Sequence, residues 1–327
     1  MISNFLKYNL LNELDIREIE KKDLDQVIQL IKKVYQSNYD KKYYDKRYLE
    51  KYISTVKKKA ITFWKGAFFQ ERLIAQMVFI IKNGVGKLKF TMVDPEFKSK
   101  GVISYLGFNM NKVLQLPFVK RSNLHMIYAY VENDNIPMIK VLEEYDFKLF
   151  GRTPNYNKKS FYKIYGRVIN IKRWKYITPY FSVSRFIQNI NIKYNLQRLL
   201  CVFIPSFSTP FTKLDLDIEI VDQKKILFLV EGIKYGKIYQ DNHSWHDFKF
   251  INNPSRDIKF SILVKLIEEF KKNEKIYSIS LFIDVNDLNS QEYLLKKGCK
   301  FFAYLPYYHE DDIILIGKTK TRDDNNE

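Results

Sequence analysis

The chain has 327 residues, 46% of them hydrophobic and 16% aromatic, which is enough for two domains with a core each. Its longest apolar run, residues 199–204, is far shorter than the roughly 20 residues of a membrane-spanning helix. Residues 1–15 have no signal-peptide core. Cys201 and Cys299 cannot form a disulfide framework, and no Cys/His group has the spacing of zinc ligands. These features exclude an integral membrane protein and predict a cytoplasmic protein without a metal.

The formal net charge is +18, and it is concentrated in one segment. Residues 147–214 contain 13 Lys or Arg and no Asp or Glu. A drift in composition toward Lys, Asn, Ile and Tyr explains such a segment without any function. The functional alternative is an anionic partner: a nucleic acid, a membrane surface, an acidic carrier protein or nucleotide phosphates. Nucleic acid is disfavoured, because the sequence contains no RNA- or DNA-recognition motif.

The first half of the chain predicts helices and strands in an order typical of an α+β fold. Residues 15–19 alternate in polarity as a strand does, and Asp23 precedes a helix with one apolar face, as an N-cap residue would. A tyrosine-rich link, residues 39–44, follows that helix. The remaining elements are predicted in this order: helix 48–56; strands 60–69, 73–82 and 87–93; a helix from 101 to about 114; strand 125–131; helix 135–145; and two strands that end near 165.

The second half predicts a connector and then a further set of elements. Residues 166–214 show no clear periodicity and are predicted to be a basic connector, and the polar tail 319–327 is predicted to be disordered. The elements predicted between them are strands 218–221, 226–231 and 237–239; helix 259–272; strand 277–285; helix 289–297; and strands 301–307 and 313–318. The segment 127–150 has a weak sequence echo at 279–302, an offset of 152 residues, which suggests a duplication whose second copy has diverged.

Histidines offer no metal site in this sequence. His243 and His246 are three residues apart but fall in a predicted loop without Asp or Cys at ligand spacing. His125 and His309 are isolated. No metal ligand is predicted.

The most informative segment joins the strand that ends at Val93 to the following helix. Pro95 halts ladder pairing, and the basic turn Phe97-Lys98-Ser99-Lys100-Gly101-Val102 leads into the helix. The first backbone amides of a helix have no partners within it, and the helix dipole adds partial positive charge there. Such a turn binds phosphate groups, and Gly101 would let them approach the backbone closely. An ordinary capped surface helix shares this pattern.

These residues resemble the first motif of the GNAT superfamily of acyl-CoA N-acyltransferases. The stretch Val93-Asp94-Pro95-Glu96-Phe97 matches the lead-in of that motif, and Gly101 matches its central glycine. Lys98 replaces the usual Arg or Gln, and Ile103 replaces a small residue. The resemblance implies that the strand edge at Met92 and Val93 holds the pantetheine arm of coenzyme A. It assigns the pyrophosphate to the backbone amides of Lys98, Ser99, Lys100, Gly101, Val102, Ile103 and Ser104.

The second GNAT motif resembles residues 131–147, where Val131, Asn135 and Phe147 fall in register. Asn135 is expected to cap a helix and, by resemblance, to hydrogen-bond the cofactor. Met138 and Val141 keep an apolar face on this helix.

One departure from the second motif concerns proton transfer. Leu142 occupies the position where many family members have a tyrosine that returns a proton to the CoA thiolate. Tyr145, one turn later, or Tyr130 could take this role, and Glu132 is the candidate base for the acceptor amine. Deprotonation through water is an open alternative.

Together the motifs predict a GNAT-like domain in residues 1–165, with a mixed central sheet flanked by helices. Residues 215–318 are predicted to be a degenerate GNAT-like α+β domain without a phosphate turn. The predicted activity is transfer of an acyl group, with acetyl-CoA (or another acyl-CoA) as co-substrate, by direct attack of an amine. The acceptor is expected to be a small-molecule amine that binds near residues 35–48. The alternative is a non-catalytic GNAT-like protein that uses residues 147–214 to hold an anionic partner.

Overall fold

The computed structural model describes residues 10–35, 41–53, 55–57, 60–155, 160–169, 214, 216–222, 225–241, 244–308 and 311–320. Contacts divide the chain into two compact units. The first unit comprises residues 1–130, 135–148 and 165–170, and the second comprises residues 131–134, 149–164 and 171–327. The sequence places the division at residue 165, whereas the contacts group residues 149–164 with the second unit.

Part of the sequence-based prediction falls outside the described residues. This applies to residues 170–213, which make up most of the predicted basic connector, and to residues 321–327 of the predicted tail. In the part of the chain that the structure describes, no helix combines the length and the apolar character that a bilayer crossing requires.

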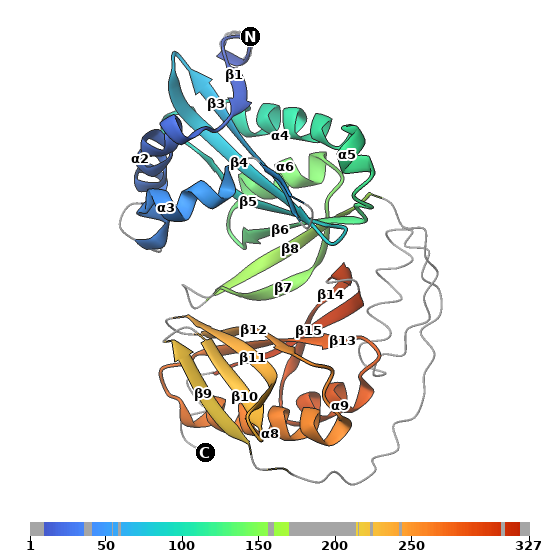
Figure 1. The fold of residues 1–327 in the computed structure, drawn as a ribbon. Coiled ribbons are helices and arrows are strands. Elements are labelled where there is room, and N and C mark those ends of the chain that lie inside the picture. The colour runs from blue at the N-terminus through green and yellow to red at the C-terminus, as the bar shows by residue number, and fades with distance from the viewer. Residues whose placement is uncertain are drawn as a thin grey trace. The chain divides into compact units, whose positions relative to one another are not determined.

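The first unit is a mixed sheet with helices on both faces (Figure 1). Strands β1, β3, β4, β5 and β6 lie side by side in that order, and β2 pairs with β3. These neighbours are antiparallel except for β5 and β6, which are parallel, so the predicted α+β class is confirmed. The elements up to residue 168 are β1 (Asp15–Glu18), η1 (Lys21–Asp23), α2 (Leu24–Tyr35), η2 (Lys41–Tyr44), α3 (Lys46–Leu49), η3 (Glu50–Tyr52), β2 (Thr55–Lys57), β3 (Ala60–Phe69), β4 (Arg72–Lys82), β5 (Val85–Val93), η4 (Pro95–Phe97), α4 (Val102–Val113), α5 (Pro117–Lys120), β6 (Met126–Glu132), α6 (Ile136–Glu144), β7 (Lys148–Asn155) and β8 (Ser160–Val168).

Alternation along β4 explains why helices cover both faces of this sheet. Successive side chains of a strand point to opposite faces. Val78 and Ile80 pack with Trp64 in the core beneath α2, whereas Met77 and Phe79 line the space beneath α4 and α6. The apolar face of α2 is buried, and burying each such side chain stabilises the fold by roughly 1.5–3 kcal/mol. The central strands are therefore packed on both faces. The candidate site lies where β5 ends, at Val93.

Two local predictions in the first unit are wrong. Asp23 is not an N-cap residue but the last residue of η1, where its carboxylate accepts hydrogen bonds from the Glu20 amide (2.9 Å) and from Arg17 (2.7 and 2.8 Å). The predicted helix 48–56 ends at Tyr52, because residues 55–57 form β2 and pair with the start of β3. Thr55 and Val56 are β-branched, and such side chains fit a strand better than a helix.

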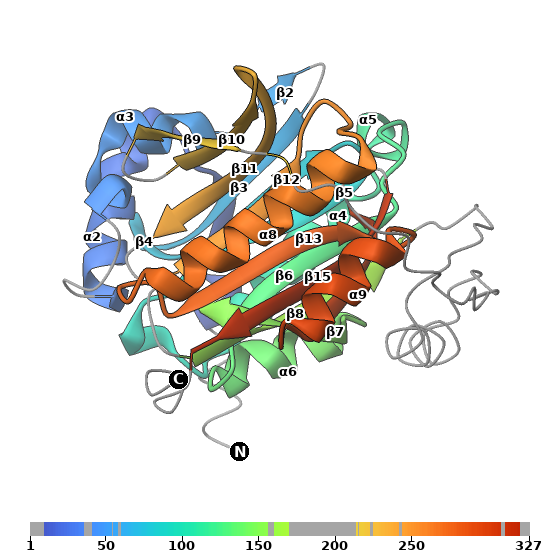
Figure 2. The same cartoon turned by 90° about the horizontal axis from the view of Figure 1, so that it is seen from below.

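The second unit contains a mixed sheet whose strands follow the order β14-β15-β13-β12-β11-β10-β9. Neighbouring strands are antiparallel except β12 and β13, which are parallel and joined through α8. Helices α8 and α9 lie across one face of this sheet (Figure 2). The elements are β9 (Asp217–Asp222), β10 (Lys225–Val230), β11 (Ile233–Asp241), β12 (Ser244–Phe250), α8 (Arg256–Lys272), β13 (Ser278–Asp284), α9 (Leu288–Lys296), β14 (Lys300–Tyr308) and β15 (Asp311–Thr319).

Strand β12 is absent from the sequence-based prediction, which places His246 in a loop. The structure places His246 within β12, opposite Tyr239 of β11. A bulge between Trp245 and Phe248 explains the miss. Both side chains are buried although they are three residues apart, so the strand lacks the alternation of period two that identifies strands.

The predicted internal echo coincides with matching elements. Strand β13 begins and ends 152 residues after β6, and α9 begins and ends 152 residues after α6. The N-cap residues also correspond: the side chain of Asn135 accepts from the Met138 amide, and that of Asp287 accepts from the Ser290 amide. The two segments therefore share the boundaries of a strand and a helix, in addition to a few identical residues.

Candidate functional site

The site is built on the turn between β5 and α4. The Asp94 amide donates to the Ile74 carbonyl (2.7 Å), which ties the end of β5 to β4. After the single turn of η4 the chain reverses through Ser99 (φ 63°) and Gly101 (φ 80°). Only glycine adopts such a φ readily, so Gly101 suits the position where the helix begins. Lys98, Ser99 and Lys100 are exposed.

The first backbone amides of α4 are directed toward this turn. The first hydrogen bond within the helix runs from the Tyr105 amide to the Gly101 carbonyl (2.9 Å). The amides of Val102, Ile103 and Ser104 precede that bond, so the helix itself supplies no acceptor for them. Together with the positive end of the helix dipole, these amides form an arrangement suited to a phosphate anion.

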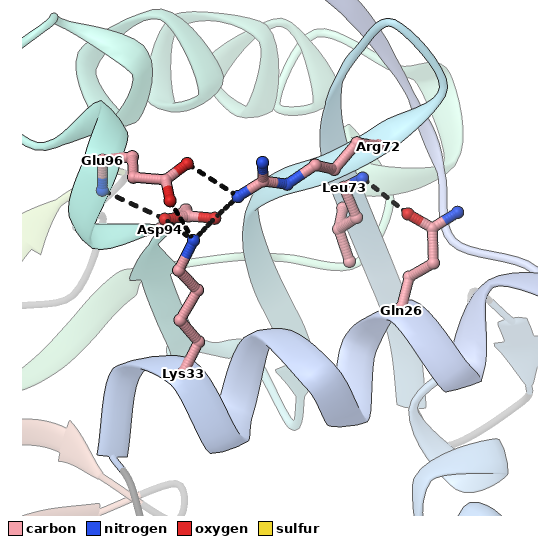
Figure 3. Close-up of polar contacts among 6 residues, drawn as sticks. All are labelled: Gln26, Lys33, Arg72, Leu73, Asp94 and Glu96. Carbon is pink, nitrogen blue, oxygen red and sulfur yellow. Dashed lines mark hydrogen bonds and ion pairs between the residues drawn. The ribbon is translucent and has the colours of Figure 1, made fainter.

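A cluster of four charged side chains, hereafter the turn cluster, surrounds the start of the turn: Lys33, Arg72, Asp94 and Glu96 (Figure 3). The Lys33 ammonium lies 3.0 Å from the Asp94 carboxylate and 2.8 Å from that of Glu96. Arg72 bonds to Asp94 and, at 3.0 Å, to Glu96. Asp94 is only 1% exposed, and its carboxylate also accepts from the Glu96 amide (3.0 Å).

The turn cluster keeps its two acids ionised. Burial alone would raise the pKa of the Asp94 carboxyl, but hydrogen bonds from the Glu96 amide, Lys33 and Arg72 hold that pKa below its ordinary value. Hydrogen bonds from Lys33 and then Arg72 lower the pKa of Glu96. Lys33 and Arg72 are not identifiable from the sequence, since no local pattern links them to Asp94, which is 61 and 22 residues away.

Part of one edge of β5, next to the turn, lies outside its ladder with β6. Its parallel ladder with β6 runs from Val85–Met126 to Leu88–Ala129 and ends there, although β5 continues to Val93. The edge from Phe90 to Val93 thus lies outside that ladder. The ladder with β4 has an irregularity opposite Gln76 and Val78, where Phe90 adopts a φ of 49° that is unusual for an aromatic residue.

Met92 and Val93, the predicted pantetheine contacts, lie on this edge. The Met92 side chain is 4% exposed and packs in the core beneath α2, where its sulfur accepts from Gln76 Nε2 (3.3 Å). Gln76 in turn accepts from Trp64 Nε1 (3.1 Å). Because the side chain of Met92 is held inside, only its backbone is available to a ligand at the strand edge.

The beginning of α6 carries Asn135, whose Oδ1 accepts from the Met138 amide (3.2 Å), so the predicted N-cap role is confirmed. The Asn135 side chain is exposed. Further along α6, Leu142 is buried and lines an apolar cavity of about 50 Å³ between α4 and α6.

Of the two predicted acid–base residues, Tyr145 lies against α4. Its hydroxyl donates to the Ser104 carbonyl (2.6 Å), and burial raises its pKa. Glu132 is the last residue of β6 and is half-buried. In the described ranges of the chain, His, Cys, Asp and Glu side chains nowhere gather in a group of three that could hold a metal ion.

Tyrosines lie beside the irregular part of β5; Tyr43 and Tyr48 fall within residues 35–48, where the acceptor is expected, and Tyr52 lies just beyond them. The rings of Tyr43 and Tyr52 contact Phe90 edge-on, with centroids 4.7 and 4.9 Å away. The Tyr48 and Tyr52 hydroxyls are 3.4 Å apart, and the Lys51 ammonium lies 3.0 Å from the centre of the Tyr48 ring. Burial would raise the pKa of Tyr48, but hydrogen bonds with Tyr52 and Lys51 leave it lowered.

Comparison with known proteins gives structural likeness without sequence relatives. No family model and no curated sequence matches the chain. About 48% of the chain is similar to solved acetyltransferases. They include the PaiA N-acetyltransferase of Thermoplasma acidophilum in complex with coenzyme A (17% identity, 99% of that chain, TM-score 0.36). Two further matches also cover 48% of the chain. They are Ard1 of Thermoplasma volcanium (19% identity, 99% of that chain, TM-score 0.38) and a GNAT-family acetyltransferase of Streptococcus pneumoniae (17% identity, 100% of that chain, TM-score 0.39). The likeness concerns the fold of about half the chain.

Proposed function

We propose that the first unit is an acyl-CoA-dependent N-acyltransferase, with acetyl-CoA as the expected donor. The observation that carries this proposal is the turn 98–104, where the exposed residues Lys98, Ser99 and Lys100 lead to a left-handed Gly101 and three helix-opening amides. The segment of β5 from Phe90 to Val93, which lies outside the ladder with β6, ends next to this turn. A donor whose diphosphate binds the amides can therefore extend its pantetheine arm along the strand edge, with backbone groups of Met92 and Val93 as hydrogen-bond partners.

The proposed reaction is direct attack on the thioester. The acceptor nitrogen bonds to the thioester carbonyl carbon, the carbon–sulfur bond breaks, and coenzyme A leaves as a thiolate that takes up a proton. The irregularity at Phe90 removes backbone groups from the regular ladder, which suits them to hold the carbonyl oxygen as it gains charge. A small-molecule amine would bind beside Tyr43, Tyr48 and Tyr52.

Proton transfer is assigned to Glu132 and Tyr145 as part of this proposal. Glu132 would accept the proton of the acceptor amine, and Tyr145 would donate one to the thiolate. Tyr145 must then release the Ser104 carbonyl to which its hydroxyl now donates. Asn135 would hydrogen-bond the donor from the exposed start of α6.

The test is calorimetric titration of the full chain with coenzyme A and acetyl-CoA, followed by detection of thiol release with a panel of amines. The proposal predicts saturable binding of both and amine-dependent thiol release from acetyl-CoA. If neither coenzyme A nor acetyl-CoA binds, the proposed function is contradicted. The alternative of a non-catalytic protein that holds an anionic partner rests on residues 147–214, most of which lie outside the described residues, and stays a prediction.

A further inference from the structure

The turn that is proposed to hold the donor diphosphate contains an electrostatic conflict. Between β5 and α4 the sequence carries Lys98 and Lys100, which favour an anion, but also Asp94 and Glu96, which repel one. These four charges cancel. A turn with no net charge and two carboxylates close to its amides is a poor phosphate site unless the carboxylates are compensated.

The turn cluster supplies that compensation from elsewhere in the fold. We propose that Lys33 and Arg72 are positioning residues for the acyl donor, because they neutralise Asp94 and Glu96 and fix the turn without contacting the donor. Both cations engage both carboxylates (Figure 3). The positive charges of Lys33 and Arg72 offset the negative charges of Asp94 and Glu96. The turn then has a net positive charge, which comes from Lys98 and Lys100. This inference rests on the proposed function of the same site.

The same contacts also fix the turn mechanically. Lys33 is directed by α2, which is held against the β3–β4 connection: Gln26 accepts from the Leu73 amide (2.7 Å) and donates to the Glu71 carbonyl (3.2 Å). Gln26 and Lys33 are seven residues apart and therefore share one face of the helix. The contacts of Gln26 with this connection thus fix the position of α2 and, with it, the position of the Lys33 ammonium.

Arg72 fixes the other side of the turn. Its guanidinium lies 5.8 Å from the centre of the Phe97 ring, and that ring packs against Phe69 with centroids 5.8 Å apart. Arg72 and Phe69 flank the connection between β3 and β4. Both ends of the turn cluster are therefore anchored to elements that precede the turn in sequence, and the backbone of Pro95–Phe97 is held between them.

The test compares Lys33→Met and Arg72→Met with Lys32→Met in the full chain. Lys32 is exposed on the same helix, so its replacement removes the same charge from the adjacent position. We expect the first two variants to raise the KM for acetyl-CoA roughly three- to tenfold at low ionic strength, with kcat changed less than about twofold. Lys32→Met should leave both constants unchanged, and Lys33→Arg should retain wild-type values.

A second pair of variants separates charge from fold. Glu96→Gln removes an exposed carboxylate, so it should lower the KM for acetyl-CoA, and combining it with Lys33→Met should restore much of the lost affinity. An unchanged KM for acetyl-CoA in Glu96→Gln overturns the inference, and this result can be obtained even if Lys33→Met is too unstable to assay. A double variant whose KM is no lower than that of Lys33→Met overturns it as well. Failure of the wild-type chain to bind coenzyme A would instead overturn the proposed function itself.

Discussion

At the scale of single residues, one backbone angle governs access to the turn. Gly101 has a φ of 80°, which alanine adopts at a cost of about 1 kcal/mol, and in the proposed complex its missing side chain lets the diphosphate approach the following amides. Gly101→Ala should therefore destabilise the fold slightly and weaken acetyl-CoA binding about tenfold by calorimetry. Gly232→Ala is the matched control, since Gly232 has a φ of 76° and open space around it. Equal affinity in the two variants would contradict the role of Gly101.

A second prediction at this scale concerns pH. The pKa of Asp94 is lowered in the folded state, so its contribution to stability is present above the unfolded pKa of about 3.9 and is lost as the pH falls through the folded pKa. Asp94→Asn should lower the free energy of unfolding by about 1–3 kcal/mol at pH 7. The difference from wild type should shrink as the pH approaches 3. Urea denaturation across this range measures it, with the exposed Asp134→Asn as a control that shows little effect at any pH.

The residues of the site differ in how far sequence alone identifies them. Gly101 and the cap Asn135 belong to local patterns, because a left-handed helix start and an N-cap each involve a few consecutive residues. Lys33 and Arg72 could not be found this way. Their partners are distant in sequence, and a lysine on an amphipathic helix is indistinguishable from a solvent-facing one until the helix is placed on the sheet.

At the scale of elements, the proposed donor contact depends on Asn135 as the N-cap of α6. Asn135→Ala should cost about 1 kcal/mol of stability, whereas Asn135→Ser should keep the cap and lose only the contact of the amide with the donor. Asp287→Ala removes the corresponding cap of α9 and should lower stability without changing acetyl-CoA affinity. Thermal unfolding and calorimetry on the three variants distinguish the roles. Unchanged acetyl-CoA affinity in both Asn135 variants would show that Asn135 caps α6 but does not contact the donor.

Element prediction succeeded where periodicity was regular and failed where the strand was distorted. Strands β3 and β4 follow their predicted ranges to within one residue, because a link of hairpin length separates them and Asn83-Gly84 ends β4 with hairpin chemistry. Strand β12 was missed because a bulge brings Trp245 and Phe248 to the interior three residues apart. The irregularity at Phe90 is likewise a property of the ladder with β4 and leaves no mark in the sequence of β5.

At the scale of the whole molecule, the two units are expected to differ in donor binding. The matching boundaries of β6–α6 and β13–α9 support our proposal that the second unit is a degenerate GNAT-like copy. Helix α8 is capped by Ser255, whose hydroxyl accepts from the Ile258 amide (3.4 Å) and thereby occupies one of the amides that a phosphate would need. Calorimetry should therefore give one acetyl-CoA per chain. Two sites per chain would contradict this expectation and would make the cleft of about 410 Å³ at the first turns of α8 and α9 the candidate for the second site.

The most direct measurement is hydrogen–deuterium exchange of the full chain with and without acetyl-CoA. If a diphosphate accepts hydrogen bonds from the amides of Val102, Ile103 and Ser104, exchange at these positions should slow when the donor is added. Peptides that contain residues 252–258 of the second unit should exchange at the same rate in both samples. Saturating acetyl-CoA that leaves exchange across residues 98–104 unchanged would contradict the assignment of this turn as the donor site.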